Sequence, residues 1–266
     1  METAPEAIAS GEVPRLTRAW PETGILSGFF GRDGGVSRGP YASLNLAVHV
    51  GDDAAAVEEN WRRARAQFPG KTIFARMNQV HGRRVHVVTR ANAGEARAGD
   101  GMVTDAEGIA LAIFTADCVP ILMIDRSRSV AGALHAGWRG TLAGIVEAGL
   151  DAMGRLGASA GKIRAALGPS IGLCCFEVDR ELAERFVREI PAADRHVRDG
   201  RPGKAYLDLR AIVREQLLGT GVRAEAISEI GPCTRCAADR YFSRRAAGGR
   251  TTGLQMSAVG LAAGGE

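Results

Sequence analysis

The apolar residues of this chain gather in short uninterrupted runs, and the strongest group lies in the middle of the sequence. Two runs there, 109–114 and 119–124, are separated by a polar insert that ends at Cys118. A third run, 130–134, stops at His135. Runs of this length that end at turn residues are typical of strands buried on both faces. The pattern therefore predicts three core strands, with Cys118 and His135 where strands end.

Helical patterning occurs in other parts of the chain. Residues 57–68 mix charged and apolar positions, and Asp52 or Asp53 could cap the start of that helix. Residues 141–156 carry an apolar stripe at helical spacing after a Gly-rich turn. The remaining predicted helices are 179–189 and 207–218, and the remaining predicted strands are 72–80, 84–89, 163–167 and 227–230. Two further apolar runs are 25–30 and 254–261.

The predicted elements form one folding unit. No repeat or linker divides the sequence, and strands and helices alternate too irregularly for a doubly wound fold. We expect a flexible polar segment over 1–24 and a single domain of mixed α/β (α+β) class over 25–266.

Composition changes this picture little. The chain has 266 residues, 45% of them hydrophobic, and a formal net charge of +4. Its arginines are scattered among acidic residues without a block of like charge, so we expect neither nucleic acid nor membrane as a partner. Residues 1–20 lack a signal-peptide pattern, which favours a reducing cytoplasmic location. The five cysteines are then thiols or metal ligands rather than disulfides.

Three residues at the ends of apolar runs are candidates for chemistry: His81, Cys118 and His135. Imidazole and thiolate are ligands that zinc prefers, and three protein ligands with one open position are typical of a catalytic zinc site. Their separations match no compact zinc finger, so only the fold could assemble them. Two alternatives stay open: a core thiol with two hydrogen-bonded histidines, and a metal-free nucleophile–base pair of Cys118 and His135.

Polar neighbours of these candidates extend the hypothesis. Asp117 directly precedes Cys118 and either supports the site or moves a proton, unless it only bonds the local turn. Arg139 follows His135 at the start of a predicted helix, where free N–H groups and a guanidinium suit an anion such as phosphate. The glycines of this turn could instead only permit close packing. The spacing of a P-loop is absent.

A second cysteine motif, Cys233-x-x-Cys236, matches known zinc signatures only in part. Deaminases of nucleobases combine Pro-Cys-x-x-Cys with His-x-Glu, and none of the five histidines has Glu two positions later. A structural zinc site would need a second pair, and adjacent Cys174 and Cys175 have the wrong spacing. We therefore expect Cys233 and Cys236 to be buried or packing residues.

Several motifs together resemble one protein family. The segments NQVHG (78–82), TADCVP (115–120) and HAGWRG (135–140) are similar to the three signature motifs of the YfiH-like family. Members of this family have been described as laccase-domain or polyphenol oxidase proteins and as purine nucleoside phosphorylases. Further similar segments are GGVS (34–37), YASLNL (41–46), VGDD (50–53), GPSIGLCCFEV (168–178) and YFSRR (241–245). The resemblance covers nearly the whole chain from about residue 25.

The resemblance implies a fold, a metal and a reaction. It implies layered mixed β-sheets flanked by helices in a single domain, and a zinc site (copper being the other metal) made by His81, Cys118 and His135. It implies phosphorolysis of adenosine, inosine, guanosine and methylthioadenosine, with adenosine deamination, so the enzyme would be a transferase and a hydrolase. We expect Cys118, His135 and Asp117 to be catalytic, with Asp117 transferring a proton, and a monomer or weak homodimer. The residues expected to bind nucleoside and phosphate are Arg32, Ser43, Asn45, Gln79 and Arg139.

Two rival functions come from other classes. A copper-dependent polyphenol oxidase is the older description of such sequences, but five histidines are too few for a multicopper centre. A cysteine amidase that edits peptidoglycan precursors would use Cys118 as nucleophile and His135 as base. One departure from the family pattern is the polar segment 251–255 near the C-terminus.

Overall fold

The computed structural model describes residues 16–263, and two mixed β-sheets form its centre. The six-stranded sheet has the order β13-β9-β7-β8-β5-β4, and the five-stranded sheet has the order β1-β2-β14-β6-β3. Strands of the first sheet are β4 (Val85–Val87), β5 (Gly101–Thr104), β7 (Val119–Asp125), β8 (Val130–Ala136), β9 (Arg164–Leu167) and β13 (Ile227–Glu229). Strands of the second are β1 (Leu16–Thr17), β2 (Ile25–Phe30), β3 (Ile73–Ala75), β6 (Ile109–Thr115) and β14 (Gln255–Leu261).

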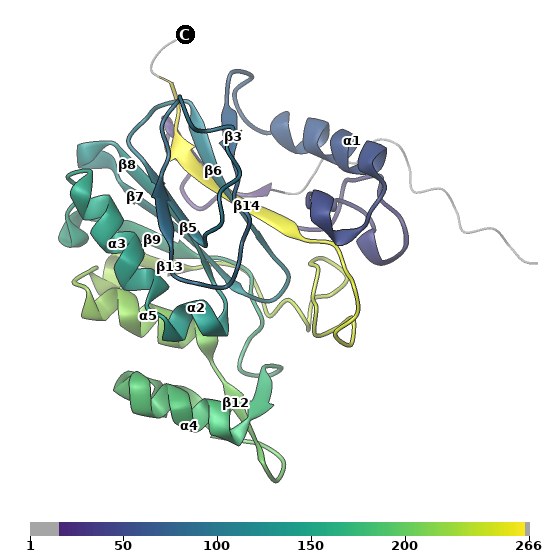
Figure 1. The fold of residues 1–266 in the computed structure, drawn as a ribbon, viewed down its shortest axis with the longest axis vertical. Helices are drawn as coiled ribbons and strands as arrows, with labels where there is room; N and C mark the ends of the chain where they lie inside the picture. The colour runs from purple at the N-terminus through teal and green to yellow at the C-terminus, as the bar shows by residue number, and fades with distance from the viewer. Residues whose placement is uncertain (1–15, 264–266) are drawn as a thin grey trace, which may run out of the picture.

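Helices cover the outer faces of these sheets, and a small third sheet lies to one side (Figure 1). Helices α3 (Ile145–Arg155) and α5 (Leu209–Gly219) pack on the six-stranded sheet, whereas α1 (Ala54–Arg65) packs on the five-stranded sheet. The third sheet consists of β10 (Glu177–Asp179), β11 (Val197–Asp199) and β12 (Lys204–Leu207), next to α4 (Arg180–Glu189). The short helices are α2 (Trp138–Leu142), η1 (Gly39–Tyr41), η2 (Val48–Val50), η3 (Arg126–Arg128), η4 (Ala160–Lys162), η5 (Pro191–His196) and η6 (Ala224–Ala226).

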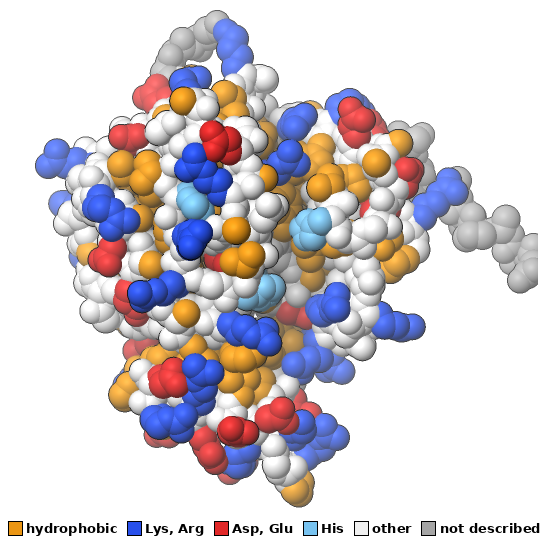
Figure 2. All heavy atoms as spheres, viewed as in Figure 1, with side chains coloured by type: hydrophobic (Ala, Val, Ile, Leu, Met, Phe, Trp, Pro, Cys, Tyr) orange, Lys and Arg blue, Asp and Glu red, His pale blue; other side chains and the backbone are white. Residues whose placement is uncertain are grey.

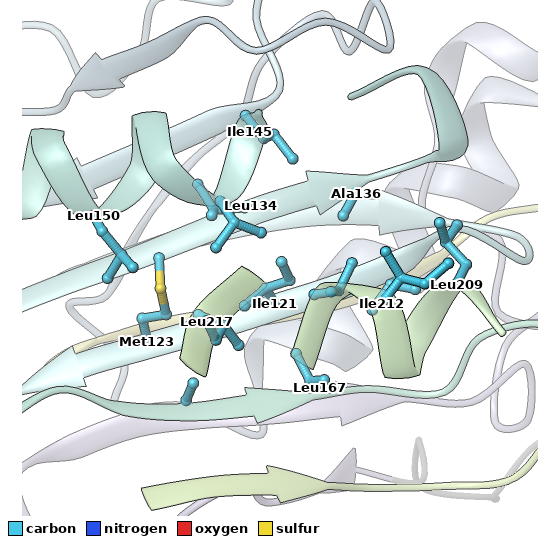
Figure 3. Packing of buried hydrophobic residues seen from close by; sticks show 14 of the residues in the cluster. Ile121, Met123, Leu134, Ala136, Ile145, Leu150, Leu167, Leu209, Ile212 and Leu217 are labelled. Carbon is cyan, nitrogen blue, oxygen red and sulfur yellow. The ribbon is translucent and has the colours of Figure 1, made fainter. Parts of the chain in front are cut away.

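Burial on both faces explains why the central strands have unbroken apolar sequences. In β6, Ile109 and Leu111 point into the core between the sheets, while the alternate Ala110 and Ala112 face α1. Strand β7 divides its side chains in the same way, and Figure 3 shows Ile121, Met123 and Leu134 among the side chains of α3 and α5. Each sheet therefore has apolar cover on both sides, and period-two alternation of polar residues is absent from its middle strands.

Two predicted helices have other bounds in the structure. The helix predicted over 57–68 is α1, which lies three residues earlier, at Ala54–Arg65. Asp53 caps α1 by accepting a hydrogen bond from Ala55 N–H, as predicted. The single helix predicted over 141–156 is wrong, because the chain forms α2 and α3 with a break between them. Gly144 at the break has a φ of 83°, a left-handed backbone that ends one helix and that glycine adopts without a Cβ clash. The strand predicted over 72–80 is also shorter than expected.

The two ends of the described chain join the same sheet. Residues 1–15 of the predicted flexible segment lie outside the described residues. Leu16 and Thr17 pair with Phe30 and Phe29, and Trp20 is buried, so the end of that segment packs on the fold.

Within residues 16–263, no helix combines the length and apolar character needed to cross a bilayer. Basic and acidic side chains are interspersed over the visible face (Figure 2), in line with the scattered charge of the sequence.

Candidate metal centre

Three side chains from distant parts of the sequence meet at one point. The possible ligand atoms of His81, Cys118 and His135 all lie within 4.8 Å of one another. Cys118 directly precedes β7 and His135 lies near the end of β8, and these strands pair antiparallel with Val119 opposite Ala136. The pairing therefore puts the thiol beside the imidazole. His81 lies in the loop between β3 and β4. Its ring packs edge-on against the His135 ring, with 4.8 Å between the two ring centroids.

The loop that carries His81 is held by a buried carboxylate. His81 has a φ of 60°, which is uncommon for a residue with a side chain. Asp100 Oδ1 accepts a hydrogen bond from His81 N–H at 2.9 Å, and Asp100 Oδ2 accepts one from Gly82 N–H at 2.7 Å. Asp100 is itself fully buried directly before β5. These bonds stabilise a backbone conformation that would otherwise be unfavourable.

The same carboxylate orients His135. Its Oδ1 lies 2.8 Å from His135 Nδ1, and the backbone N–H of His135 donates to the Asp100 carbonyl at 2.7 Å. Burial alone would raise the pKa of Asp100, but hydrogen bonds from His135 and Gly82 outweigh it and lower that pKa. An ionised carboxylate only accepts, so the Nδ1 atom carries the proton and Nε2 is left to bind a metal.

Asp100 was missed by the sequence analysis. It ends a polar loop directly before a buried strand, which is the same signal that drew attention to Cys118 and His135. The same signal, applied to the segment Gly99-Asp100-Gly101, could have identified Asp100 as a site residue.

Groups around the Cys118 thiol lower its pKa. Burial alone would raise its pKa, but the charge of His135 and hydrogen bonds from His135 and His81 outweigh burial and lower the pKa to about 6. Burial conversely favours neutral His135, while the Cys118 charge and the Asp100 hydrogen bond raise the pKa of His135 to about 9. Thiolate is the form of cysteine that binds metal.

The three residues fit a metal ion with one side open to a reactant. His135 is only 3% exposed, Cys118 is half-buried and His81 is exposed, so the group is closed on the protein side and open outward. A Cβ at Gly137 would lie 3.0 Å from Cys118 Sγ and 3.0 Å from His81 Cδ2, so glycine keeps the space clear. Two imidazole nitrogens and one thiolate are a donor set that suits zinc with a vacant position.

Asp117 points to the C-terminal loop. Its Oδ1 accepts a hydrogen bond from Thr234 Oγ1 at 2.6 Å, and its Oδ2 accepts one from the backbone N–H of Arg245 at 2.7 Å. Its φ of 98° is uncommon for a residue with a side chain. Asp117 therefore fastens a distant loop beside Cys118, and proton transfer by this carboxylate stays a prediction.

Two of the five predicted substrate residues belong to segments of the metal centre. Gln79 pairs its amide with the backbone N–H and C=O of Phe114, at 2.8 Å each, which fixes the loop before His81. Arg139 is exposed on α2, with its guanidinium 4.2 Å from the Trp138 ring centroid. Within residues 16–263 it forms no ion pair, which leaves its charge available to an anion.

The other three predicted substrate residues are bonded within neighbouring loops. Arg32 donates to the carbonyls of Ala42 at 2.6 Å and Ala238 at 2.7 Å. Ser43 donates to the Arg32 carbonyl, and Asn45 is fully buried. Of the three, Arg32 lines a cavity of about 670 Å³ whose other walls include Ser243, Ala246, Ala247 and Arg250. This cavity adjoins the loop that bonds Asp117.

A second group of potential metal ligands lies elsewhere in the structure. The sulfur atoms of Cys174, Cys175, Cys233 and Cys236 lie within 4.8 Å of one another. Cys236 is exposed and Cys233 is half-buried, so the prediction that they are buried or packing residues is wrong as to their burial. The parallel bridge between Ser170 and Cys233 brings the two segments together, and spacing along the sequence could not reveal it.

Fold and site together define the class: a layered mixed α/β protein with a His/Cys centre that is open on one side. The chain belongs to the family described as multi-copper polyphenol oxidoreductase laccase, whose family model matches residues 26–262. The crystal structure of the hypothetical protein YfiH of Bacillus licheniformis has a similar fold. Its TM-score is 0.83 at 33% identity, and the match covers 89% of this chain and 92% of that one. The resemblance to the YfiH-like family and its fold class are thereby confirmed.

Relatives of this chain carry two enzyme names. A purine nucleoside phosphorylase of Streptomyces coelicolor is 42% identical over 243 residues, covering 90% of this chain and 96% of the relative. Adenosine deaminase RL5, from an unknown prokaryotic organism, is 38% identical over 232 residues, covering 82% and 88%. Both similarities extend over most of the chain.

Proposed function

We propose that this protein is a zinc-dependent purine nucleoside phosphorylase that also deaminates adenosine. The observation that carries the proposal is the meeting of His81, Cys118 and His135 around a point open to solvent. Relatives named as purine nucleoside phosphorylase and adenosine deaminase support both reactions. Adenosine, inosine, guanosine and methylthioadenosine are the proposed substrates, with phosphate as the second reactant.

The three ligands would hold zinc, and the buried partners would keep them in place. A bound zinc ion would supply a Lewis acid that polarises a substrate atom or a water molecule at the open side. Asp100 holds the proton on His135 Nδ1 and fixes the His81 loop. Because these contacts exist before any substrate binds, little reorganisation is needed during the reaction.

Arg139 is the proposed anchor for phosphate. It lies four residues after His135 in the first turn of α2, it is exposed, and its guanidinium can donate two parallel hydrogen bonds to phosphate oxygens. In phosphorolysis a phosphate oxygen bonds to the anomeric carbon of the ribose while the bond from that carbon to the purine nitrogen breaks. The departing base must gain a proton, and Asp117 is the candidate that passes on to it a proton taken from the dihydrogen form of phosphate. To do so, Asp117 would exchange one of its bonds, to Thr234 or to Arg245 N–H, for the substrate.

The proposal is tested by metal analysis combined with a product assay. Freshly purified protein should contain zinc, and incubation with inosine and phosphate should yield hypoxanthine and ribose 1-phosphate. Cys118→Ala should lose the metal of this centre and phosphorolysis together, and Asp117→Asn should lower the rate while metal content is retained. Inosine cleavage at an unchanged rate by metal-free protein would contradict the proposal.

The same preparation separates the rivals. Copper at the His81/Cys118/His135 centre, together with oxidation of phenols, would favour the polyphenol oxidase. An acyl-thioester trapped on Cys118 would favour the amidase. In residues 16–263 no cluster of possible ligands gathers more than two histidines, which does not suit a multicopper centre.

A further inference from the structure

Four cysteine sulfurs converge from two turns that are far apart in sequence. Cys174 and Cys175 lie in a turn after β9, and Cys233 and Cys236 lie in a turn after β13. The Cys175 and Cys236 sulfurs are 3.4 Å apart, and those of Cys174 and Cys236 are 3.6 Å apart. Because Cys174 and Cys175 lie in a turn and not in a strand, neighbouring side chains can face the same point.

These distances suit four ligands of one ion. Zinc binds thiolate sulfur at about 2.3 Å, and tetrahedral geometry then separates the sulfurs by about 3.8 Å. A disulfide requires about 2.05 Å between sulfurs, much less than the distances from Cys236 to Cys174 or Cys175. A cluster of several metal ions would spread its ligands further apart. Apolar packing does not explain the group either, because Cys174 and Cys236 are exposed.

A positively charged side chain contacts one of these sulfurs. The Arg235 guanidinium donates to the Cys175 sulfur at 3.4 Å. Four thiolates around a divalent ion carry a net charge of about −2, which a guanidinium donor stabilises.

The turn that faces Cys233 also leaves little room for a larger residue. A Cβ at Gly172 would lie 3.3 Å from Cys233 Cβ and 3.6 Å from Cys174 Sγ. Glycine at this position therefore allows the two turns to approach closely enough for their sulfurs to meet.

We propose that Cys174, Cys175, Cys233 and Cys236 bind one zinc ion in a closed structural site, separate from the His81/Cys118/His135 centre. Four protein ligands complete the tetrahedron and leave no position for a reactant, so the site acts by tying two turns together. One of these turns carries Thr234, whose hydroxyl bonds Asp117 beside Cys118. The structural ion would thus fix the loop packed next to the catalytic centre.

This site is tested by counting the zinc ions bound to variants that each lack a ligand of one of the two sites. Protein purified without oxygen should hold two zinc ions per chain by native mass spectrometry. Cys118→Ala and Cys236→Ser should each hold one, and the double variant none. X-ray absorption of Cys118→Ala should detect sulfur ligands alone around its remaining zinc. The count is independent of any enzyme assay, so absence of phosphorolysis would leave this inference standing.

Three results would overturn it. One is a Cys118→Ala protein that folds without zinc, and another is iron in place of zinc at the all-sulfur site. The third is a disulfide between Cys236 and either neighbouring cysteine in protein purified without oxygen. If Cys236→Ser does not fold, the count and spectrum of Cys118→Ala decide alone. In folded Cys236→Ser, amide hydrogen exchange of Arg245, which bonds Asp117, should accelerate compared with Cys118→Ala.

Discussion

Asp100 Oδ1 lies 2.8 Å from Nδ1 of His135, and the backbone N–H of His135 returns to the Asp100 carbonyl at 2.7 Å. This double contact ties the imidazole to β5, which neighbours β8 in the sheet. The same carboxylate bonds the backbone of the loop that carries His81. One buried acid thus places two of the three proposed ligands, and it is the first target for substitution.

Replacement of this acid should weaken the metal centre more than the fold. Asp100→Asn removes the charge that orients the His135 ring, so zinc affinity should fall by about 10- to 100-fold. Competition with a chelator of known affinity measures it. Asp125→Asn is a matched control, because Asp125 is also fully buried and bonded to backbone N–H groups, at the opposite end of β7 from Cys118. Equal zinc affinity in both variants would contradict the role of Asp100.

Zinc binding should also depend on the absence of a side chain at Gly137. In Gly137→Ala the new methyl group would meet Cys118 and His81 at 3.0 Å each, so both would shift and the zinc of the His81/Cys118/His135 centre should be lost or bound far more weakly. Far-UV circular dichroism should stay unchanged, because the φ of −78° suits alanine. Gly154→Ala in α3 is the control, since nothing lies within 4 Å of that site. It should retain zinc and gain about 0.5–1 kcal/mol of stability. Full zinc binding by Gly137→Ala would refute the packing argument.

The lowered pKa of the Cys118 thiol predicts how its reactivity depends on pH. Its pKa is lowered from 9.0 to about 6, so in metal-free protein the reactive thiolate should dominate above about pH 6. Iodoacetamide labelling of Cys118, followed by peptide mass spectrometry, should reach its half-maximal rate near pH 6. Protonation below that pH should also release zinc. Cys174 is the internal control, because burial and neighbouring thiols raise its pKa. A midpoint near 9 for Cys118 would exclude the predicted ionisation.

Loss of the Arg139 charge should affect phosphate specifically. Arg139→Ala should raise KM for phosphate by about 10-fold or more, because a charge-assisted pair of hydrogen bonds is lost, while KM for inosine changes little. Steady-state kinetics with each reactant varied in turn measure the difference. Arg128→Ala is the control, since Arg128 is exposed just beyond the far end of β7. If both variants keep the phosphate KM of the parent, the anion site lies elsewhere.

The bond between Thr234 and Asp117 should contribute measurably to stability. Thr234→Val removes a donor from a buried carboxylate, which should lower the free energy of unfolding by about 1.5–3 kcal/mol in urea titrations. Thr141→Val is the comparison, because Thr141 is equally buried but donates to the neutral carbonyl of Gly137. Its expected loss is about 0.5–1.5 kcal/mol. A smaller loss at Thr234 than at Thr141 would mean that Asp117 is stabilised by other contacts.

Several features of this protein could be predicted from its sequence. The runs that became β6, β7 and β8 were predicted within one or two residues, because strands buried on both faces permit hardly any polar residue along their length. The placement of Cys118 and His135 at the ends of such runs followed from the same pattern. The motifs around them sufficed to indicate the family.

The tertiary structure decided which atoms meet. The break at Gly144 depends on a left-handed backbone that an apolar stripe does not encode. Asp100 reaches His135 because β5 pairs with β8, and the four cysteines converge because two turns cross at Ser170 and Cys233. Sequence patterns record which face of an element is buried, through local periodicity. Contacts between distant residues depend on strand order and crossing loops, which only the folded chain specifies.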